Sequence, residues 1–253
     1  MAERLDAVGV QMDGMYKLAD ARLSQAATQA NSTLSEIKAL NGRIAQNQGS
    51  GQTPNDLLDQ RDAALEKLGG LVAFNTVASD DGAINVFAAN GAALLVGNQQ
   101  AQFSMAADPA DASRTVLKLS NGAASQLLEA DDIRGGSLSG LLRFRDDDLA
   151  SARNQVGRIA LVIADAFNKQ QAAGVDASGN AGTNLFTVAG PVTRPASTNT
   201  GTGTMAVTVA NSSALVPSDY SVQWDGTNYT VTRMSDGQAT VAAGLPATID
   251  GLQ

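Results

Sequence analysis

The segment from Ser137 to Gly174 constrains the fold more than any other part of the chain. Apolar or small side chains recur in it at steps of three and four residues, which is the spacing of one α-helix face. This apolar series comprises Leu138, Leu142, Leu149, Ala152, Val156, Ile159, Ile163 and Ala166, with Arg145 and Gln170 at positions of the same spacing. Ser137 is a suitable N-cap and Gly174 a suitable residue after the last turn. The segment is predicted to form one helix of roughly 55 Å, which other long helices must cover.

Two more helices are predicted in the first third of the chain. Residues 3–47 carry an alanine-rich apolar series with similar spacing, interrupted by three glycines. The sequence TPND at residues 53–56 is typical of a helix start, with Thr53 as the N-cap, and Gly69-Gly70 ends that helix. Because the loop at residues 48–52 is short, we expect these two helices to pair in antiparallel fashion.

Two regions show the alternating pattern of β-strands. After Gly70 the apolar period changes to two, and turn sequences such as Asn90-Gly91 and Asn121-Gly122 separate short segments. The predicted strands of this first region are LVAFNTVA, AINVFAA, ALLVG, QFSM, TVLKLS and SQLL. A glycine-rich connector follows Gly174 and leads to the second region, with strand candidates TMAVTVA, DYSVQW, NYTVTRM and ATVAAG.

These patterns predict an α+β fold: an elongated bundle of long antiparallel helices with an inserted small antiparallel β-sheet, plus a second all-β domain. The predicted helical rod domain comprises residues 1–70 with 135–174. Residues 71–134 form an inserted β-hairpin subdomain, and residues 175–253 an outer β-domain. Since the sequence stops just after a strand-like segment, we expect the outer domain to be incomplete.

Composition excludes several classes of function. The chain has no cysteine and no histidine, so it cannot form a disulfide, a Cys/His zinc site or a Ser-His-Asp triad. The net charge of −8, with no basic run, argues against a nucleic-acid partner. No stretch approaches the roughly 20 apolar residues of a membrane span, and the N-terminus lacks the features of a secretory signal. No cofactor, metal or membrane insertion is expected.

Three short motifs resemble chemical sites, and a structural role is the better interpretation of each. Residues 35–38 match S-x-x-K but lie inside a predicted helix. The acidic run at residues 146–148 points in several directions on a helix, and Arg143, Arg145 and Arg153 flank it at spacings that predict local ion pairs. Asp176, Ser178 and Asn180 have the spacing of a calcium loop, but Ala181 and Thr187 replace its glycine and glutamate.

The residues that we expect to matter belong to the helices. Asp59 and Arg61 are predicted to make polar contacts between helices, with Arg61 bridging to an acid. A charge at Val156 or Ile159 is expected to unfold the helical domain. The candidate structural or interface residues are Asp59, Arg61, Leu142, Val156, Ile159 and Ile163, and no catalytic residue is predicted.

Three stretches together resemble the bacterial flagellar hook-associated protein 1 family. Asn55–Leu71 contains N-x-L-x-D-Q-R-D, Asp80–Asn98 contains DDG-x-x-N-V and N-G-x-x-L-L-V-G, and Gly135–Phe186 contains G-L-L-x-F-R-D, A-R-N-Q and A-D-A-F-N. The resemblance identifies the chain as a central fragment that lacks the family's terminal segments. It implies an extracellular flagellar subunit, exported by the type III apparatus without a cleaved signal. It also implies a ring of copies at the hook–filament junction, in contact with hook protein and other hook-associated proteins.

Two alternatives to a junction subunit remain. A flagellin-like or other axial filament component would differ in its terminal segments. A secreted acidic glycosidase or carbohydrate-binding module would need two facing carboxylates, and Trp224 with three tyrosines makes a poor platform for sugars. We predict a structural protein and not an enzyme.

Overall fold

The computed structural model describes residues 2–48 and 54–253, and the chain divides into two compact units. The central unit is Met15–Asp146, and the split unit combines Met1–Gly14 with Asp147–Gln253. Helix α1 (Ala2–Gln48) has 47 residues, which corresponds to roughly 70 Å. The long N-terminal helix predicted from the sequence is therefore confirmed. The predicted three-part domain division stays a prediction.

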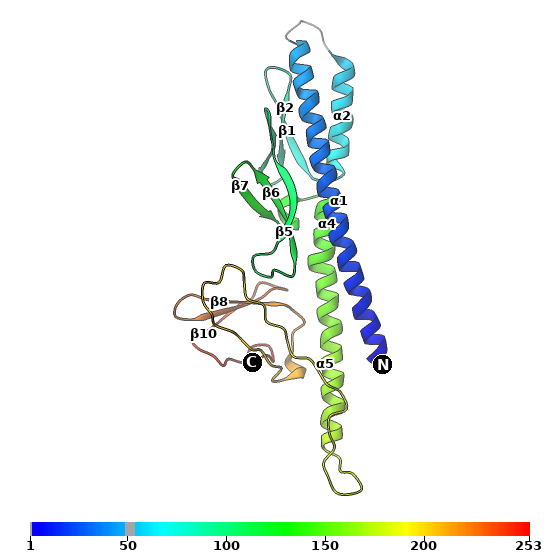
Figure 1. The fold of residues 1–253 in the computed structure, drawn as a ribbon, viewed down its shortest axis with the longest axis vertical. Helices are drawn as coiled ribbons and strands as arrows, with labels where there is room; N and C mark the ends of the chain where they lie inside the picture. Colours follow the sequence, from blue (N-terminus) through cyan, green and yellow to red (C-terminus); the bar gives the residue numbers. More distant parts are fainter. Residues whose placement is uncertain (1, 49–53) are drawn as a thin grey trace. The chain divides into compact units, whose positions relative to one another are not determined.

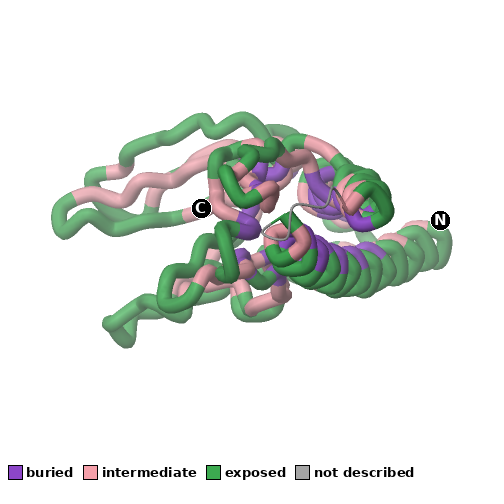
Figure 2. Tube along the Cα trace, turned by 90° about the horizontal axis from the view of Figure 1, so that it is seen from above, coloured by how far each residue is buried: buried purple, intermediate pink, exposed green. Residues whose placement is uncertain are grey.

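The helices of the central unit bury one side of α1. Helix α2 (Asn55–Gly69) lies beside the C-terminal part of α1 and runs in the opposite direction (Figure 1). Buried positions follow one side of α1, and exposed positions follow the other (Figure 2). Pro54 precedes α2 without a side-chain cap, whereas the N-cap expected at Thr53 and the loop at residues 49–52 lie outside the described residues. The buried positions of α1 include Leu23, Ala30, Leu34, Ile37 and Ile44.

Two antiparallel sheets complete the central unit, where the sequence predicted one. The first sheet has the order β1 (Phe74–Ala78), β2 (Ile84–Ala88), β3 (Ala93–Val96), β4 (Gln99–Gln100). The second has the order β5 (Gln102–Ala107), β6 (Thr115–Asn121), β7 (Ala124–Leu128). With only two residues, β4 is too short to show an alternating pattern in the sequence. Val86, Leu95 and Leu117 point into one core that both sheets share with the helices.

Two asparagines of α1 attach this helix to the sheets. The side chain of Asn41 donates to the carbonyl oxygen of Ile84 at 2.8 Å and accepts from its N–H at 3.2 Å. Asn31 makes the same pair of hydrogen bonds with Phe103, both at 2.8 Å. Each asparagine therefore satisfies a strand edge that would otherwise bury unpaired backbone groups. A buried amide on a helix costs little when both its atoms are paired in this way.

The helix predicted over residues 137–174 forms as three consecutive segments. These are α4 (Gly136–Arg143), a π-helical turn (Phe144–Leu149) and α5 (Ala150–Ala172). Ser137 is not the N-cap, because α4 begins at Gly136 and Gly135 is its N-cap. The N–H of Ser137 donates to the carbonyl oxygen of Gly70 at 3.0 Å. The short helix α3 (Ala130–Ile133) precedes α4.

The split unit contains a third antiparallel sheet. Its order is β10 (Ala239–Ala242), β9 (Tyr229–Arg233), β8 (Tyr220–Trp224), and a 3-10 turn, η2 (Ser212–Ala214), precedes it. The strand predicted over residues 204–210 is wrong. This segment is extended, but it forms only an isolated bridge, between Val209 and Leu252. Alternating threonine and valine suit any extended backbone, so the pattern does not reveal whether a neighbouring strand exists.

Candidate functional site

The apolar series continues along α5 but is not buried there. Ile159 is 52% exposed, whereas Leu142 in the central unit is 1% exposed. Val156 and Ile163 are half-buried. The structure describes every residue of α5, and among them only Ala164 is buried. The expectation that a charge at Ile159 would unfold the helical domain is therefore wrong, because this side chain already contacts water.

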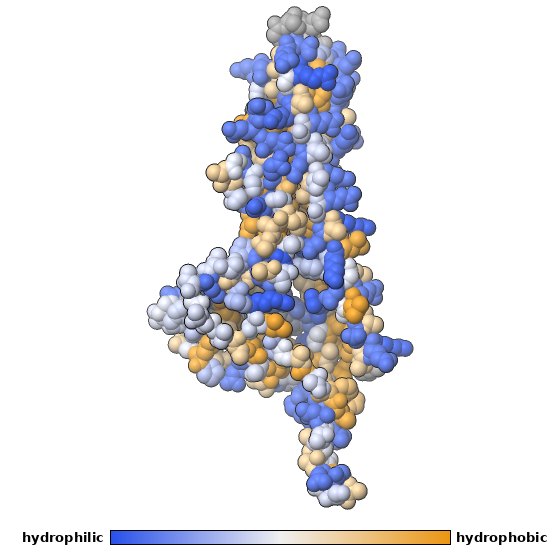
Figure 3. Space-filling model, in the orientation of Figure 1, coloured by the Kyte–Doolittle hydropathy of each residue, from blue (hydrophilic) through white to orange (hydrophobic). Residues whose placement is uncertain are grey.

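A groove runs along this face of α5. Its volume is about 300 Å³, and its floor and walls are mainly apolar. Apolar surface is visible over α5 in the space-filling view (Figure 3). The groove is lined by Gln155, Arg158, Ile159, Val162, Ile163 and Pro217, and we call it the α5 groove. Exposed apolar surface of this kind is typical of protein interaction sites.

Other positions of α5 contact the chain's own segments. The hydroxyl of Ser212 donates to Asp165, which also pairs with Lys169 at 2.8 Å. The hydrogen bond from Lys169, and then that from Ser212, lowers the pKa of Asp165. The ring of Phe167 meets that of Phe186 edge to face, with centroids 5.9 Å apart. These contacts fix the rotation of α5 within the split unit and leave the α5 groove open.

On α2, the structure gives Arg61 a partner different from the predicted one. Its Nη1 donates to the carbonyl oxygen of Gly82 at 2.8 Å and to Oδ1 of Asn41 at 3.5 Å. The acidic partner expected from the sequence is wrong, because neutral oxygens of the β1–β2 turn and of α1 occupy that position. Asp59 is exposed on α2.

One of the arginines around the acidic run makes the predicted local ion pair, because Arg145 pairs with Asp146 at 2.7 Å. All three arginines also pair with acids outside the run. Arg145 is 1% exposed, and it occupies the apolar series between Leu142 and Leu149. That position was the one signal in the sequence that this arginine is buried. The distant ion pairs are Arg143–Asp131 at 3.7 Å, Arg145–Asp20 at 2.6 Å and Arg153–Asp13 at 3.2 Å.

The calcium-like loop is closed by its own hydrogen bonds. Oδ1 of Asp176 accepts from the N–H groups of Ser178 at 2.8 Å and Asn180 at 2.9 Å. These bonds, with that of Asn180 the strongest, lower the pKa of Asp176. Across residues 2–48 and 54–253, no three acidic side chains gather in a way that could hold a metal ion. The S-x-x-K motif at residues 35–38 lies on α1.

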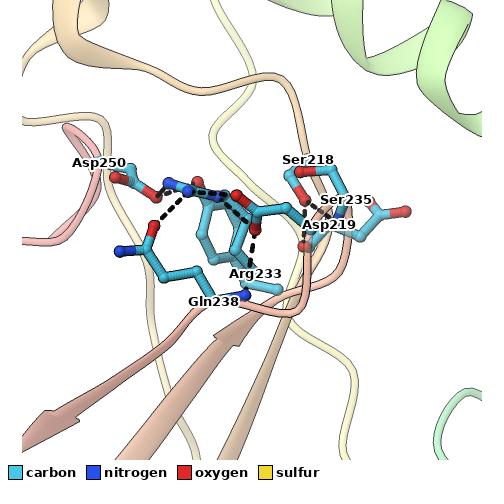
Figure 4. Close-up of polar contacts among 8 residues, drawn as sticks. Ser218, Asp219, Arg233, Ser235, Gln238 and Asp250 are labelled. Atoms are coloured by element: carbon cyan, nitrogen blue, oxygen red, sulfur yellow. Dashed lines mark hydrogen bonds and ion pairs between the residues drawn. The ribbon is translucent and has the colours of Figure 1, made fainter.

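A polar cluster centred on Arg233 fixes the sheet of the split unit (Figure 4). Its guanidinium donates to both carboxylate oxygens of Asp236, at 2.9 and 2.6 Å, and to Asp250 at 2.9 Å. The hydroxyl of Tyr220 donates to Asp250 at 2.8 Å. Arg233 lowers the pKa of Asp236 to about 2, and burial, followed by Asp250, raises the pKa of Tyr220. The cluster therefore joins β8, β9 and the C-terminal segment through charged groups.

The β8–β10 sheet is expected to be less stable in acid than at neutral pH. The pKa of Asp236 is lower in the folded state than its ordinary value of 3.8, so its stabilising effect is complete above pH 4 and is lost as the pH falls toward 2. Fluorescence of Trp224, the single tryptophan and a residue of β8, reports this sheet. We expect its melting temperature to fall over that range, and Asp236→Asn to remove part of the fall. Asp59→Asn, at an exposed position of α2, is the control. Identical acid profiles for wild type and Asp236→Asn would contradict the assignment.

The fold and the site together define a class of protein. Its helices are long, α5 presents an apolar groove, and a β-rich part is held by polar clusters, which is the architecture of an elongated-helix α+β protein. Among the described residues, no helix has both the length and the apolar character needed to cross a membrane. The enzyme-like motifs of the sequence lie on helix surfaces or in closed turns.

Two family models match the chain. Residues 1–186 match the flagellar hook-associated protein FlgK helical domain, and residues 195–253 match the flagellar hook-associated protein 1, D2-like domain. The chain belongs to the flagellar hook-associated protein 1 family. The resemblance seen in the sequence and the predicted α+β class are both confirmed.

Individual relatives agree with this result. Flagellar hook-associated protein 1 of Escherichia coli K12 is 34% identical over 231 residues, covering 89% of this chain and 42% of the relative. Its counterpart from Salmonella typhimurium LT2 is 36% identical over 238 residues, covering 91% and 43%. The structure of the flagellar hook junction protein FlgK from Burkholderia pseudomallei is similar, with a TM-score of 0.90 and 36% identity over 99% of this chain and 47% of that chain. The chain thus spans less than half the length of these relatives.

Proposed function

We propose that the chain is part of a structural subunit of the bacterial flagellum that joins the hook to the filament by protein–protein association. The similar Burkholderia pseudomallei protein is a flagellar hook junction protein, and the relatives are flagellar hook-associated proteins. In this proposal the subunit is extracellular and is exported without a cleaved signal. Its partners are further copies in a ring, the hook protein and other hook-associated proteins.

The observation that carries the proposal is the exposed α5 groove. Ile159 presents half of its surface to water beside Val162 and Ile163. Covering one such side chain contributes about 1.5–3 kcal/mol, so a partner that fills the groove gains affinity from a few residues. Arg158 and Gln155 at the same groove add polar groups that can fix the orientation of the partner.

The domain division fits the same proposal. We propose that residues 1–70 with 135–174 provide the helical contacts, that residues 71–134 support them, and that residues 175–253 form an outer β-domain. The boundary between the two matching family models, at residues 186 to 195, supports a separate outer domain.

A glycosidase is the less favoured function. A second surface groove, about 620 Å³, is lined by Asp131 together with Arg134 and Arg143. Hydrolysis of a glycosidic bond by two carboxylates needs a second acid facing the first, and the described residues lining this groove provide one acid and two guanidiniums. Membership of the hook-associated protein 1 family likewise favours the junction subunit over a flagellin-like component.

Ile159→Asp is expected to prevent association without unfolding the chain. The carboxylate can stay hydrated in the free subunit, but a covered groove would bury it. In a strain lacking the gene, the full-length protein carrying this substitution should attach filaments about tenfold less well or worse, since losing at least 1.4 kcal/mol of contact free energy is a factor of ten. Circular dichroism should show wild-type helix content and melting.

Val77→Asp is the matched control for that experiment. Val77 is 53% exposed on β1 of the central unit. The substitution therefore introduces the same charge at an equally exposed apolar residue that does not line the groove. We expect it to support normal attachment. Normal attachment by Ile159→Asp as well, or loss of attachment by both variants alike, would reject the α5 groove as the contact.

A further inference from the structure

Arg145 is a charged residue at a position where the helix otherwise buries leucines. It lies three residues after Leu142 and four before Leu149, and all three side chains are buried. A buried charge is costly unless its hydrogen bonds are made. The hydrogen-bond partners of Arg145 therefore indicate why a charged residue occupies this position.

All three nitrogens of the Arg145 guanidinium have carboxylate partners. Nε and Nη2 donate to the two oxygens of Asp146, at 2.8 and 2.7 Å, and Nη1 donates to Asp20 of α1 at 2.6 Å. The ring of Tyr16 lies 5.8 Å from the guanidinium carbon. Arg114, next to β6, donates to Asp146 at 3.0 Å. We call these five residues, all in the central unit, the Arg145 cluster.

The pairing between Arg145 and Asp146 depends on the π-helical turn that contains them. In an α-helix, neighbouring side chains are about 100° apart and do not face each other. The wider turn of the π-helix, Phe144–Leu149, brings the carboxylate of Asp146 against the guanidinium of the preceding residue with two hydrogen bonds. Both partners of this ion pair thus lie within the π-helical turn.

The cluster is not fully satisfied. The hydroxyl of Tyr16 and Nε of Arg114 are buried and make no hydrogen bond to the described protein. Incompletely paired buried polar groups cost free energy, and an apolar side chain at position 145 would avoid much of that cost. The cluster is thus better explained by the conformation that it selects than by the stability that it adds.

The turn also lies where the chain passes from one compact unit to the other. The crossings are at residues 14–15 in α1 and at 146–147 within the π-helical turn. The π-helical turn therefore contains the second of these two crossings.

We propose that the Arg145 cluster holds residues 144–149 in the π-helical form, and that loss of its contacts lets this segment rewind as an α-helix. Rewinding one π-helical turn changes the phase between α4 and α5 by about one residue, or ~100°. The segment would then have two discrete forms, which is the property of a conformational switch. This proposed change of residues 144–149 from a π-helical to an α-helical form does not depend on the proposal that a partner binds the α5 groove.

Spin labels on α4 and α5 test this directly. The chain contains no cysteine, so Gly140→Cys and Gly157→Cys in the full chain take two labels specifically, and both glycines have open space around a Cβ. Arg145→Met removes the cluster's central charge. Asp20→Asn removes the charge of one carboxylate acceptor but keeps the size of the side chain and an oxygen acceptor. Arg143→Met is the control, because Arg143 lies two residues before Arg145 and makes an exposed ion pair with Asp131.

We expect Arg145→Met and Asp20→Asn to add a second distance population between the labels. Hydrogen exchange of the amides of residues 144–149 should become about tenfold faster in both variants, while Arg143→Met should change neither measurement. A single wild-type distance with unchanged exchange in both cluster variants overturns the proposal, as does an equal response to Arg143→Met. If Arg145→Met unfolds the central unit, the result with Asp20→Asn decides alone.

Discussion

Leu142→Asp is expected to unfold the central unit. Leu142 is 1% exposed and belongs to the core that α4 shares with α1 and the two sheets. An aspartate there would place a carboxylate among leucines and isoleucines without a partner, and would also remove the apolar contacts of the leucine. We expect a loss of about 4 kcal/mol or more, which is a large share of the 5–15 kcal/mol that stabilises a typical domain. Urea unfolding followed by circular dichroism measures it.

Two further variants separate burial from other effects of the substitution. Leu142→Met keeps the volume and apolar character, so it should cost less than about 1.5 kcal/mol. Leu127→Asp places the same charge on β7 of the same unit, where the leucine is 42% exposed, and it should cost about 1 kcal/mol or less. A loss for Leu142→Asp no greater than that for Leu127→Asp would show that α4 is not packed as the structure has it.

The same apolar series in α4 and α5 shows how far sequence periodicity extends. Steps of three and four predicted that Leu142 and Ile159 share a helix face, but not what covers that face. In the structure Leu142 is buried, whereas Ile159 is half-exposed. Periodicity reports which side chains point together, and burial depends on segments that are distant in the sequence. The candidate site could be predicted as a stripe of residues, but not as a groove.

Polar residues inside the core were the other part that the sequence did not reveal. Asn31, Asn41 and Arg145 each look like interruptions of an apolar series. Each is paired with a group from 20 to 125 positions away, such as Asp20 for Arg145. Helix propensity and spacing are local properties, so they cannot identify a partner on another segment. The strands with clear turn signals, such as Asn90-Gly91 before β3, were by contrast predictable.

Gly136→Ala is expected to destabilise the central unit nearly as strongly as a buried charge does. Gly136 has a φ of +72°, and a Cβ there would overlap the backbone of Leu71 and Val72. Those atoms cannot move freely, because Leu138 donates to the carbonyl oxygen of Leu71 at 3.0 Å, at the start of α4. The left-handed backbone alone costs an alanine about 1–2 kcal/mol, and displacing a packed backbone brings the expected loss to about 3 kcal/mol.

Gly140→Ala, four residues later in the same helix, makes the comparison decisive. The position has ordinary helical geometry within α4, and nothing lies within 4 Å of an added Cβ. Alanine is the better helix former, so we expect a gain of up to about 1 kcal/mol. In urea titrations, the alanine substitution should therefore lower the free energy of unfolding at Gly136 and raise it at Gly140. Effects of the same sign and size would mean that the contact with Leu71 and Val72 does not hold the start of α4.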